Sequence, residues 1–475
     1  MSWNTASFMG WLYWVYWIVA IIIMVRVMLK NRDTVKTLAW IMVFVFLPFL
    51  GLVLYFFFGR DTRRKRVLGT RMLSQIKQRS QLEGKGMGKA CIEGEYQALA
   101  TFLENSSSAS LLSADGIEVI TETSRFSDAL FDIVSSAKEH IHLQFYIFED
   151  DEFGRRLRDL LVAKAKQGVE VRLIYDSVGC WKVSKEFFES MRCSGVYVEC
   201  FLKVRFPILS NRFNYRNHRK VVVVDGRVGM VGGCNIADRY LKGIRGGAWR
   251  DTMLLLKGAA VNGLQASFLI DWCMASRTLL SGKRYFPSTE YNAGPLVQVA
   301  TSNPVGDIRP IEGALMKALA TAKGYAYLQT PYFMPDESFL RSLKNASVSG
   351  VDVRLMIPEY SDSWIADYGA RAYLGDLLNA GVKVYLYGKG MLHSKTMVCD
   401  DYFSSVGSTN LDFRSFFYNF EISSFVYDKS VALKLKDTFM EDVKECRLLT
   451  LNEYRSRSFS RRCLESFVKL FSPLL

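Results

Sequence analysis

The sequence predicts an α/β protein built from two similar halves and preceded by a hairpin of two hydrophobic helices. Three observations point to this class. A short histidine–lysine–aspartate motif occurs twice, in residues 217–225 and 392–400. A pattern of strand, helix and strand also occurs twice, and this alternation is typical of a sheet covered by helices, an α/β sandwich. Two long apolar runs precede both repeats.

The apolar runs occupy residues 1–60, where we expect membrane-spanning helices over about 8–28 and 37–58. Roughly 20 apolar residues suffice for a helix to cross the hydrocarbon core of a bilayer. A cleaved signal peptide is disfavoured, because no basic stretch precedes the first run and no small-residue cleavage site follows it. Basic residues flank the second run on both sides, with a slight excess after it, which favours a multi-pass segment of the cell membrane with the rest of the chain in the cytoplasm. Buried soluble helices and a re-entrant insertion are the alternatives.

The remaining chain divides into a linker and two halves. Residues 61–110 are basic and rich in glycine, which predicts a flexible juxtamembrane linker that can lie on anionic headgroups. We expect the first half over 111–290 and the second over 291–475. Each half contains the strand–helix–strand pattern, over 143–173 and 328–355, with a glycine at the end of the helix. The similar spacing from these units to the motifs indicates one ancestral half used twice.

Each motif has the form H-x-K-x4-D. His218 and Lys220 lie two residues apart in the first copy, as do His393 and Lys395 in the second, so on a strand each pair faces one side. An ammonium group neutralises phosphate oxygens, and an imidazole attacks phosphorus or moves a proton near neutral pH. The chain has only four histidines, and two of them stand at equivalent positions in the copies. A chance surface motif is therefore disfavoured, and phosphate chemistry is indicated.

The residues after each motif extend the pattern. Asp225-Gly226 predicts the turn of a hairpin whose return strand, Val228–Val231, brings Asn235 back beside the histidine. Asp225 and its equivalent Asp400 end their strands, so holding these turns is an alternative to contact with a substrate.

Composition limits the partners and cofactors. The formal net charge of +14 favours anionic partners, either nucleic acid or an acidic membrane surface. The nine cysteines are scattered and lack C-x-x-C spacing, which predicts reduced thiols in a cytosolic setting and neither a disulfide frame nor a zinc site. No metal-ligand cluster is visible, so no metal or other cofactor is expected. His140 and His142 begin a predicted strand and are expected to be structural or surface residues.

The doubled motif resembles that of the phospholipase D superfamily, and its flanks resemble bacterial cardiolipin synthases. The likeness covers nearly the whole chain, including the hydrophobic N-terminal segment. It rests on Tyr215-Arg216-Asn217-His218-Arg219-Lys220, Ala248-Trp249-Arg250-Asp251-Thr252, Asp412-Phe413-Arg414-Ser415, Asn419-Phe420-Glu421 and Ser472-Pro473-Leu474-Leu475. The resemblance implies that the halves pack about a pseudo-twofold axis and build one site from both histidine–lysine pairs.

The resemblance also implies the residues of that site. The catalytic set is His218, Lys220, Asp225, His393, Lys395 and Asp400, and the set that binds phosphate or supports the site is Asn235, Asn410, Asp251, Glu421, Gly233 and Ser408. Asp251 and Glu421 match the acids that orient the histidines. In the implied mechanism His218 attacks phosphorus to form a phosphohistidine and His393 acts as acid and then base, although the symmetry permits the reverse order.

The implied reaction is that of a cardiolipin synthase, which transfers a phosphatidyl group from one phosphatidylglycerol to another and releases glycerol. Phosphatidylglycerol and anionic membrane lipids are the expected partners, in a membrane-embedded protein, and nucleic acid is not expected. A membrane phospholipase D or another phosphatidyltransferase would use the same site with a different acceptor. A phosphodiesterase or nuclease of the superfamily would also use it, but hydrophobic helices are hard to motivate there.

The C-terminal segment predicts an amphipathic, basic helix. Phe459, Cys463, Phe467 and Phe471 recur at four-residue spacing, and the arginines fall largely elsewhere around the helix. Docking onto the core of the protein and contact with lipid are equally compatible with this pattern.

Overall fold

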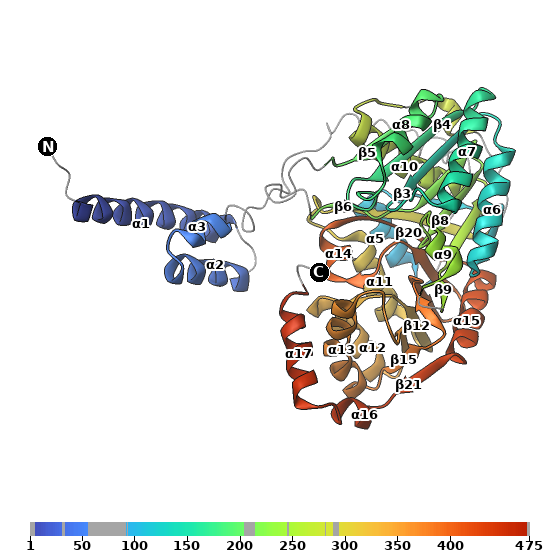
Figure 1. Ribbon diagram of the computed structural model, residues 1–475. Helices are drawn as coiled ribbons and strands as arrows, with labels where there is room; N and C mark the ends of the chain where they lie inside the picture. Colours follow the sequence, from blue (N-terminus) through green and yellow to red (C-terminus); the bar gives the residue numbers. More distant parts are fainter. Residues whose placement is uncertain are drawn as a thin grey trace. The chain divides into compact units, whose positions relative to one another are not determined.

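The computed structural model describes residues 5–30, 34–55, 92, 94–203, 214–244, 247–280, 282–287 and 294–472. The described residues form two compact units (Figure 1). The N-terminal helices make up the smaller unit. The described residues from 92 onward make up the other, which we call the large unit.

The N-terminal unit consists of α1 (Thr5–Lys30), α2 (Thr34–Phe46) and α3 (Leu50–Leu54). The α1 and α2 helices pack on one another, and the Tyr16 hydroxyl donates a hydrogen bond to the carbonyl of Phe44. Much of the rest of the surface of α1 is apolar and exposed, from Trp11 to Leu29.

The expected helix over 37–58 is divided in the structure. It ends as α2 at Phe46, because Pro48 has no backbone N–H and disfavours helical backbone in the preceding residue. The 13 residues of α2 reach about 20 Å, which is less than the ~30 Å hydrocarbon core. In the described part of the chain, no helix has both the length and the apolar character needed to span a bilayer. The predicted pair of spanning helices is therefore not found there, and residues 56–58 lie outside the described ranges.

The first sheet of the large unit has seven strands in the order β2-β10-β8-β7-β3-β4-β5. Their bounds are β2 (Gly116–Ile120), β10 (Met253–Lys257), β8 (Val228–Gly232), β7 (Val221–Val224), β3 (His140–Phe145), β4 (Glu170–Asp176) and β5 (Tyr197–Phe201). The associated helices are α6 (Thr123–Ser136), α7 (Glu152–Lys166), α8 (Lys185–Cys193), α9 (Asp238–Lys242) and α10 (Val261–Ser276). The predicted strand–helix–strand unit is confirmed as β3, α7 and the parallel β4, and Gly168 follows the helix with a φ of +88°.

The second sheet has ten strands, nine of them in the order β1-β11-β20-β18-β17-β12-β14-β15-β21, with β6 paired to β20. Their bounds are β1 (Leu111–Ser113), β6 (Arg216–Asn217), β11 (Leu296–Ser302), β12 (Tyr325–Gln329), β14 (Asp352–Pro358), β15 (Lys383–Tyr387), β17 (Thr396–Cys399), β18 (Phe403–Gly407), β20 (Asn419–Tyr427) and β21 (Cys446–Leu449). The helices are α5 (Gln97–Ser107), α11 (Pro310–Thr321), α12 (Glu337–Val348), α13 (Trp364–Asn379), α14 (Phe413–Phe417), α15 (Lys429–Val443), α16 (Leu451–Arg455) and α17 (Phe459–Leu470). The second predicted unit is confirmed as β12, α12 and the parallel β14. Two short pairs complete the strands: β9 (Ala248–Arg250) with β16 (Gly390–Leu392), and β13 (Phe333–Met334) with β19 (Leu411–Asp412).

A shared apolar layer joins the two sheets. Its side chains come from β7, β8 and β10 of the first sheet and from β11, β17, β18 and β20 of the second, with α10 and α15 contributing. The α6, α7 and α8 helices cover the outer face of the first sheet. The α5, α11, α12 and α13 helices cover that of the second. Each half is thus an α/β sandwich, as the sequence predicted.

The boundary between the halves is less simple than the sequence suggested. Residues 97–107 were expected to be linker, but they form α5, which packs on α11 and β11 because Leu99 and Leu103 are buried there. The next strand, β1, was assigned to the first half and instead pairs with β11 of the second sheet. Residues 61–91 of the expected linker lie outside the described ranges.

Candidate active site

The hairpin predicted for the first motif is confirmed, and the second motif forms one as well. The β7 strand turns back into the antiparallel β8, and β17 turns back into β18. Each strand begins just after its motif lysine. The histidine–lysine pairs therefore precede the strands, whereas we had expected them to lie within the strands.

The motif aspartates lie at the far end of these strands. Asp225 adopts a φ of +52° and accepts hydrogen bonds from the backbone N–H groups of residues 138, 139 and 140, at 2.8–2.9 Å. Asp400 does the same for residues 323, 324 and 325, at 2.7–2.9 Å. At ~3.3 Å per residue, four strand residues separate each aspartate from its lysine by about 16 Å. The structure therefore does not bring these two aspartates to the histidines, and the alternative of holding a turn describes them.

A strand from the opposite half positions each motif histidine. The short β6 strand pairs in parallel with β20, so that Asn217 stands beside Phe420, and the next residue, His218, donates its backbone N–H to the Phe420 carbonyl at 2.9 Å. In the other half, β16 pairs in parallel with β9, and the His393 N–H is 2.6 Å from the Arg250 carbonyl. In both pairs the next residue of the supporting strand is an acid. The register therefore places each histidine opposite a carboxylate.

The histidine–acid pairs consequently cross between the halves. His218 Nδ1 lies 3.0 and 3.2 Å from the carboxylate oxygens of Glu421, and also 3.1 Å from the Ser408 carbonyl. His393 Nδ1 lies 2.6 Å from Asp251 Oδ2. A carboxylate partner requires a proton on Nδ1, which leaves the lone pair on Nε2. The sequence identified both acids but gave no sign that each serves the distant histidine.

Burial and charge explain the ionisation of these groups. Burial lowers the pKa of His218 against the opposing effect of Glu421. Burial and the adjacent Lys395 lower the pKa of His393 to about 4. Burial alone would raise the pKa values of the two acids, but the histidines and lysines hold them below their ordinary values. In the free protein both imidazoles are therefore neutral and both acids ionised near pH 7.

Both motif lysines are buried beside their histidines. Lys220 Nζ donates to the His218 carbonyl at 2.6 Å, and Lys395 Nζ donates to the His393 carbonyl. Burial lowers the pKa of Lys220 to about 7 and that of Lys395 to about 8, against the opposing carboxylates. Each lysine also lowers the pKa of the other motif's histidine. The two motifs therefore lie close enough to affect one another electrostatically.

Gly233 and Ser408, which were expected to bind phosphate or support the site, contact the two acids. A Cβ at Gly233 would lie 2.0 Å from Asp251 Oδ1, so only glycine leaves room for that carboxylate. At the equivalent place the Ser408 hydroxyl donates to Glu421 Oε2. Both residues fix the acids, and the acids fix the histidines.

Asn235 and Asn410 are buried in the same region. The Asn235 side chain accepts from the Ile147 N–H at 3.1 Å and donates to the Tyr240 hydroxyl at 2.6 Å. Within the described residues, Asn410 Oδ1 has no hydrogen-bond partner. The return strand β8 ends shortly before Asn235, as expected, but protein groups already occupy the amide of Asn235.

Four aromatic rings surround the histidines, and no sequence pattern predicted this. The Tyr146 ring lies 5.2 Å from that of His218. The rings of Trp249, Tyr240 and Tyr332 lie 4.9, 5.9 and 6.5 Å from His393. A signal was present for two of them, because Tyr146 and Tyr332 each follow within a few residues of a Leu-Gln pair that begins both repeated units, at residues 143–144 and 328–329.

A buried polar network supports the first motif and was also missed. Asp271, on α10, accepts from Arg219 at 2.7 Å, Asn217 at 2.9 Å and Gln144 at 2.5 Å. Arg216 pairs with the buried Asp176 at 3.2 Å. Asp271 and Asp176 therefore fix the segment that carries His218. Arg216 has a structural partner in Asp176.

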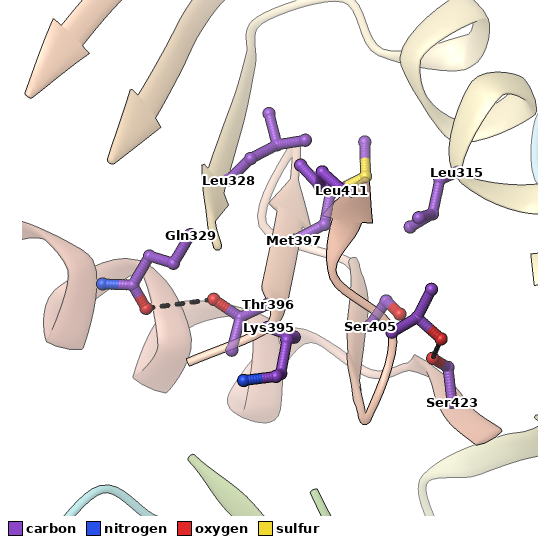
Figure 2. Close-up of a pocket in the computed structure, with 10 residues that line it drawn as sticks. Leu315, Leu328, Gln329, Lys395, Thr396, Met397, Ser405, Leu411 and Ser423 are labelled. Carbon is purple, nitrogen blue, oxygen red and sulfur yellow. Dashed lines mark hydrogen bonds between the residues drawn. The ribbon is translucent and has the colours of Figure 1, made fainter. Parts of the chain in front are cut away.

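A small cavity between β17 and α11 has Lys395 among its lining residues (Figure 2). Thr396 donates to Gln329 at its polar edge, at 3.0 Å, and Leu315 and Leu328 line the apolar side. Figure 2 shows the Lys395 nitrogen directed away from Leu315 and Leu328. Neither motif histidine lines this cavity.

The other two histidines lie in the core of the first half. His140 and His142 are buried at the end of β3 that carries the Asp225 turn, and His142 stacks on Phe268. Burial lowers the pKa of His140 to about 4. This structural role confirms one of the two roles expected for them. Among the described residues, no group of three or more histidine, cysteine or acidic side chains is arranged to hold a metal ion.

The chain is similar to known families over both of its units. The family described as cardiolipin synthase, PLD-like domain, matches residues 130–272 and 315–443, one stretch in each half. The family described as phospholipase D-nuclease N-terminal matches residues 15–60.

Curated relatives cover nearly the whole chain. The major cardiolipin synthase of Bacillus subtilis (strain 168) is 39% identical over 458 residues, which is 94% of this chain and 95% of that protein. The cardiolipin synthase of Listeria monocytogenes serotype 4a (strain HCC23) is 37% identical over 462 residues, with coverage of 95% and 96%.

A solved structure shares the fold. The phosphatidylserine synthase of Haemophilus influenzae Rd KW20 superposes with a TM-score of 0.61 over 81% of this chain and 100% of that one, at 13% identity.

Proposed function

We propose that this chain, which belongs to the cardiolipin synthase family with phospholipase D-like domains, transfers a phosphatidyl group between two phosphatidylglycerol molecules and releases glycerol. One observation carries the proposal. Two neutral histidines, each oriented by an acid of the opposite half, share one buried site with two lysines. This arrangement suits in-line exchange at one phosphorus atom.

In the first step, Nε2 of His218 attacks the phosphorus of the donor and the bond to the glycerol oxygen breaks. His393 gives a proton to that oxygen, so glycerol leaves neutral and a phosphatidyl–histidine bond remains. In the second step the hydroxyl of another phosphatidylglycerol attacks phosphorus, His393 takes its proton, and His218 is released.

The donor phosphate supplies the charge that His393 needs to act as an acid. In the free site, burial and Lys395 lower the pKa of His393 to about 4. A bound phosphodiester places a negative charge beside His393 and offsets the positive charge of the two lysines. Both effects raise the pKa of His393 toward the working pH. Lys220 and Lys395 then stabilise the charge that develops on the phosphoryl oxygens.

Glu421 and Asp251 act as positioning groups in this mechanism. Each holds the Nδ1 proton of its histidine, and Glu421 stabilises the positive imidazole that attack by His218 creates. We assign the nucleophile to His218 from the family resemblance. The more exposed side chain of His218, 13% against 6% for His393, supports this order.

The membrane is the source of both substrates, and we propose that the apolar α1–α3 unit attaches the chain to it. The exposed apolar residues of α1, from Trp11 to Leu29, support this attachment. We place the large unit on the cytoplasmic side of the cell membrane. All the cysteines that the structure describes are free, which fits a reducing compartment.

Purified full-length protein in vesicles of phosphatidylglycerol, without any nucleotide-activated lipid, tests the proposal. We expect cardiolipin and glycerol in equal amounts, and loss of both products in His218→Ala and His393→Ala. Phosphatidic acid as the sole lipid product would identify a hydrolase, and cleavage of nucleic acid without lipid turnover would identify a nuclease.

A further inference from the structure

The C-terminal helix α17 packs on the large unit by its charged side. Glu465 is only 2% exposed and accepts hydrogen bonds from Arg457 and, at 3.3 Å, from Arg461. The other buried side chain of the helix, Val468, packs beside Gly369 of α13. Figure 1 shows α17 along the outside of α13. A surface helix of a soluble protein normally buries its apolar side, so this packing is reversed.

The opposite side of α17 is apolar and exposed. We call it the docking face, and it consists of Phe459, Leu464, Phe467, Leu470 and Phe471. The exposed fractions of Phe459 and Leu470 reach 79% and 75%. The rings of Phe467 and Phe471 meet edge to face at 5.2 Å, so they form one patch. A continuous apolar patch of this kind marks a surface that binds another apolar surface.

The charges around the docking face select the partner. The single acidic residue of α17, Glu465, is the buried one, whereas Arg462 is exposed and Lys469 is half-buried. An apolar face with basic residues and no exposed acid fits a bilayer that contains anionic lipids.

In each half, an exposed tryptophan lies in a segment that contacts the aromatic residue beside the motif histidine. Trp364, which begins α13, is 61% exposed. Two residues earlier, Asp362 accepts a hydrogen bond from Tyr332 at 2.8 Å, and the Tyr332 ring contacts His393. The loop that carries Trp364 is therefore one contact away from the site.

The other half repeats this arrangement. Trp181 is 69% exposed and follows Gly179, which packs against the Tyr146 carbonyl. The Tyr146 ring contacts His218 at 5.2 Å. We call Trp181 and Trp364 the mouth tryptophans. Indole rings favour the headgroup level of a membrane, because they join an apolar body to a polar N–H group.

We propose that the docking face and the mouth tryptophans form one surface that seats the active site on an anionic phospholipid bilayer. Donor and acceptor lipids then reach the histidines without leaving the membrane. This access of lipids to the histidines rests on the proposed function, whereas the contact of the docking face with the bilayer can be measured without any turnover.

The contact is tested with a fluorescent label on Cys463, an exposed cysteine of α17. The full chain carries Cys91→Ser and Cys193→Ser and is placed in nanodiscs of phosphatidylglycerol or phosphatidylcholine. We expect the emission of an environment-sensitive dye to shift toward the blue in phosphatidylglycerol, and the shift to be lost in Phe467→Ser/Leu470→Ser. The control Val348→Ser removes a side chain that is 75% exposed at the end of α12 and should keep the shift.

A label that stays in a water-like environment in phosphatidylglycerol discs would overturn the proposal. So would a shift that ignores lipid composition and grows with protein concentration, because a second copy would then cover the face.

Turnover separates docking from chemistry. In Phe467→Ser/Leu470→Ser we expect about tenfold slower cardiolipin synthesis on vesicles, because two apolar side chains no longer enter the bilayer. Turnover of a monomeric short-chain phosphatidylglycerol should stay unchanged. Equal losses on both substrates would indicate a damaged fold and count against docking. A lipid-dependent shift without any cardiolipin would leave docking standing and refute the proposed function.

Discussion

The crossed histidine–acid pairs make a sharp prediction for Glu421→Gln. This change keeps the size of the side chain and removes its charge, 3.0 Å from His218 Nδ1. Replacing a charge-assisted hydrogen bond by a neutral one costs about 1–2 kcal/mol. A full charge interaction at this distance with an effective dielectric constant of ~20 sets an upper bound of about 5 kcal/mol. We therefore expect kcat/KM to fall between about 10-fold and about 5,000-fold.

The pH profile of Glu421→Gln should change as well. Glu421 raises the pKa of Lys220, which burial has lowered to about 7, so its loss lowers that pKa further. Lys220 is needed in its charged form, and that form disappears as pH rises through its pKa. The alkaline limb of kcat/KM should therefore move to lower pH.

A buried glutamate outside the site provides the matched control. Burial and the neighbouring Asp336 raise the pKa of Glu312 to about 8, so it is protonated at pH 7 and an amide replaces it closely. Glu312→Gln should keep wild-type activity and profile when product formation is followed on phosphatidylglycerol vesicles. Activity within about threefold of wild type in Glu421→Gln, with an unmoved alkaline limb, would refute the crossed pairing as a functional device.

Three further changes probe the site. Asp225→Ala removes three hydrogen bonds to backbone N–H groups. It should lower the free energy of unfolding by about 2–4 kcal/mol in denaturant titrations, while the folded fraction keeps the wild-type kcat. A hundredfold loss of kcat would show that this aspartate takes part in the chemistry. Gly233→Ala puts a methyl group 2.0 Å from Asp251 Oδ1 and should slow turnover about 100-fold in the vesicle assay. A wild-type rate in this variant would show that the Asp251 side chain has room to move. Inorganic phosphate should raise the melting temperature at pH 6.5, because Lys220 and Lys395 are charged at that pH and have no bound anion. At 100 times its Kd, phosphate should stabilise the folded protein by about 2.7 kcal/mol. An equal rise in melting temperature in Lys220→Met/Lys395→Met would place the phosphate elsewhere.

The fold was largely predictable because both halves repeat the same local signals. Alternating apolar strands, helix-ending glycines such as Gly168, and the Asp225-Gly226 turn are local features that survive in the structure. The strand β1 was misassigned because it is short and pairs with a strand far along the chain. The second N-terminal helix was overestimated because apolar character was weighed above the helix-breaking effect of Pro48.

The site was predictable in its residue types and not in its pairings. Hydrogen-bonding groups two residues apart are visible in a sequence, but the partner of His218 is set by the register of β6 on β20, which no local pattern encodes. The same holds for Gly233, whose neighbour is a carboxylate and not a ligand. The aromatic rings around the histidines were missed because Tyr146 and Tyr332 fall in the short segments after their strands, where periodicity gives no direction.

The most direct test of the shared site is the stoichiometry of the covalent intermediate. Wild-type protein is mixed with phosphatidylglycerol labelled at phosphorus, quenched at low temperature and mapped by peptide mass spectrometry. Since one site with two histidines in different roles is proposed, label should reach no more than one phosphate per chain, on His218 alone, and His393→Ala should form no cardiolipin. Label on both histidines, or cardiolipin made by His393→Ala at about half the wild-type rate as two independent sites would do, would contradict the account.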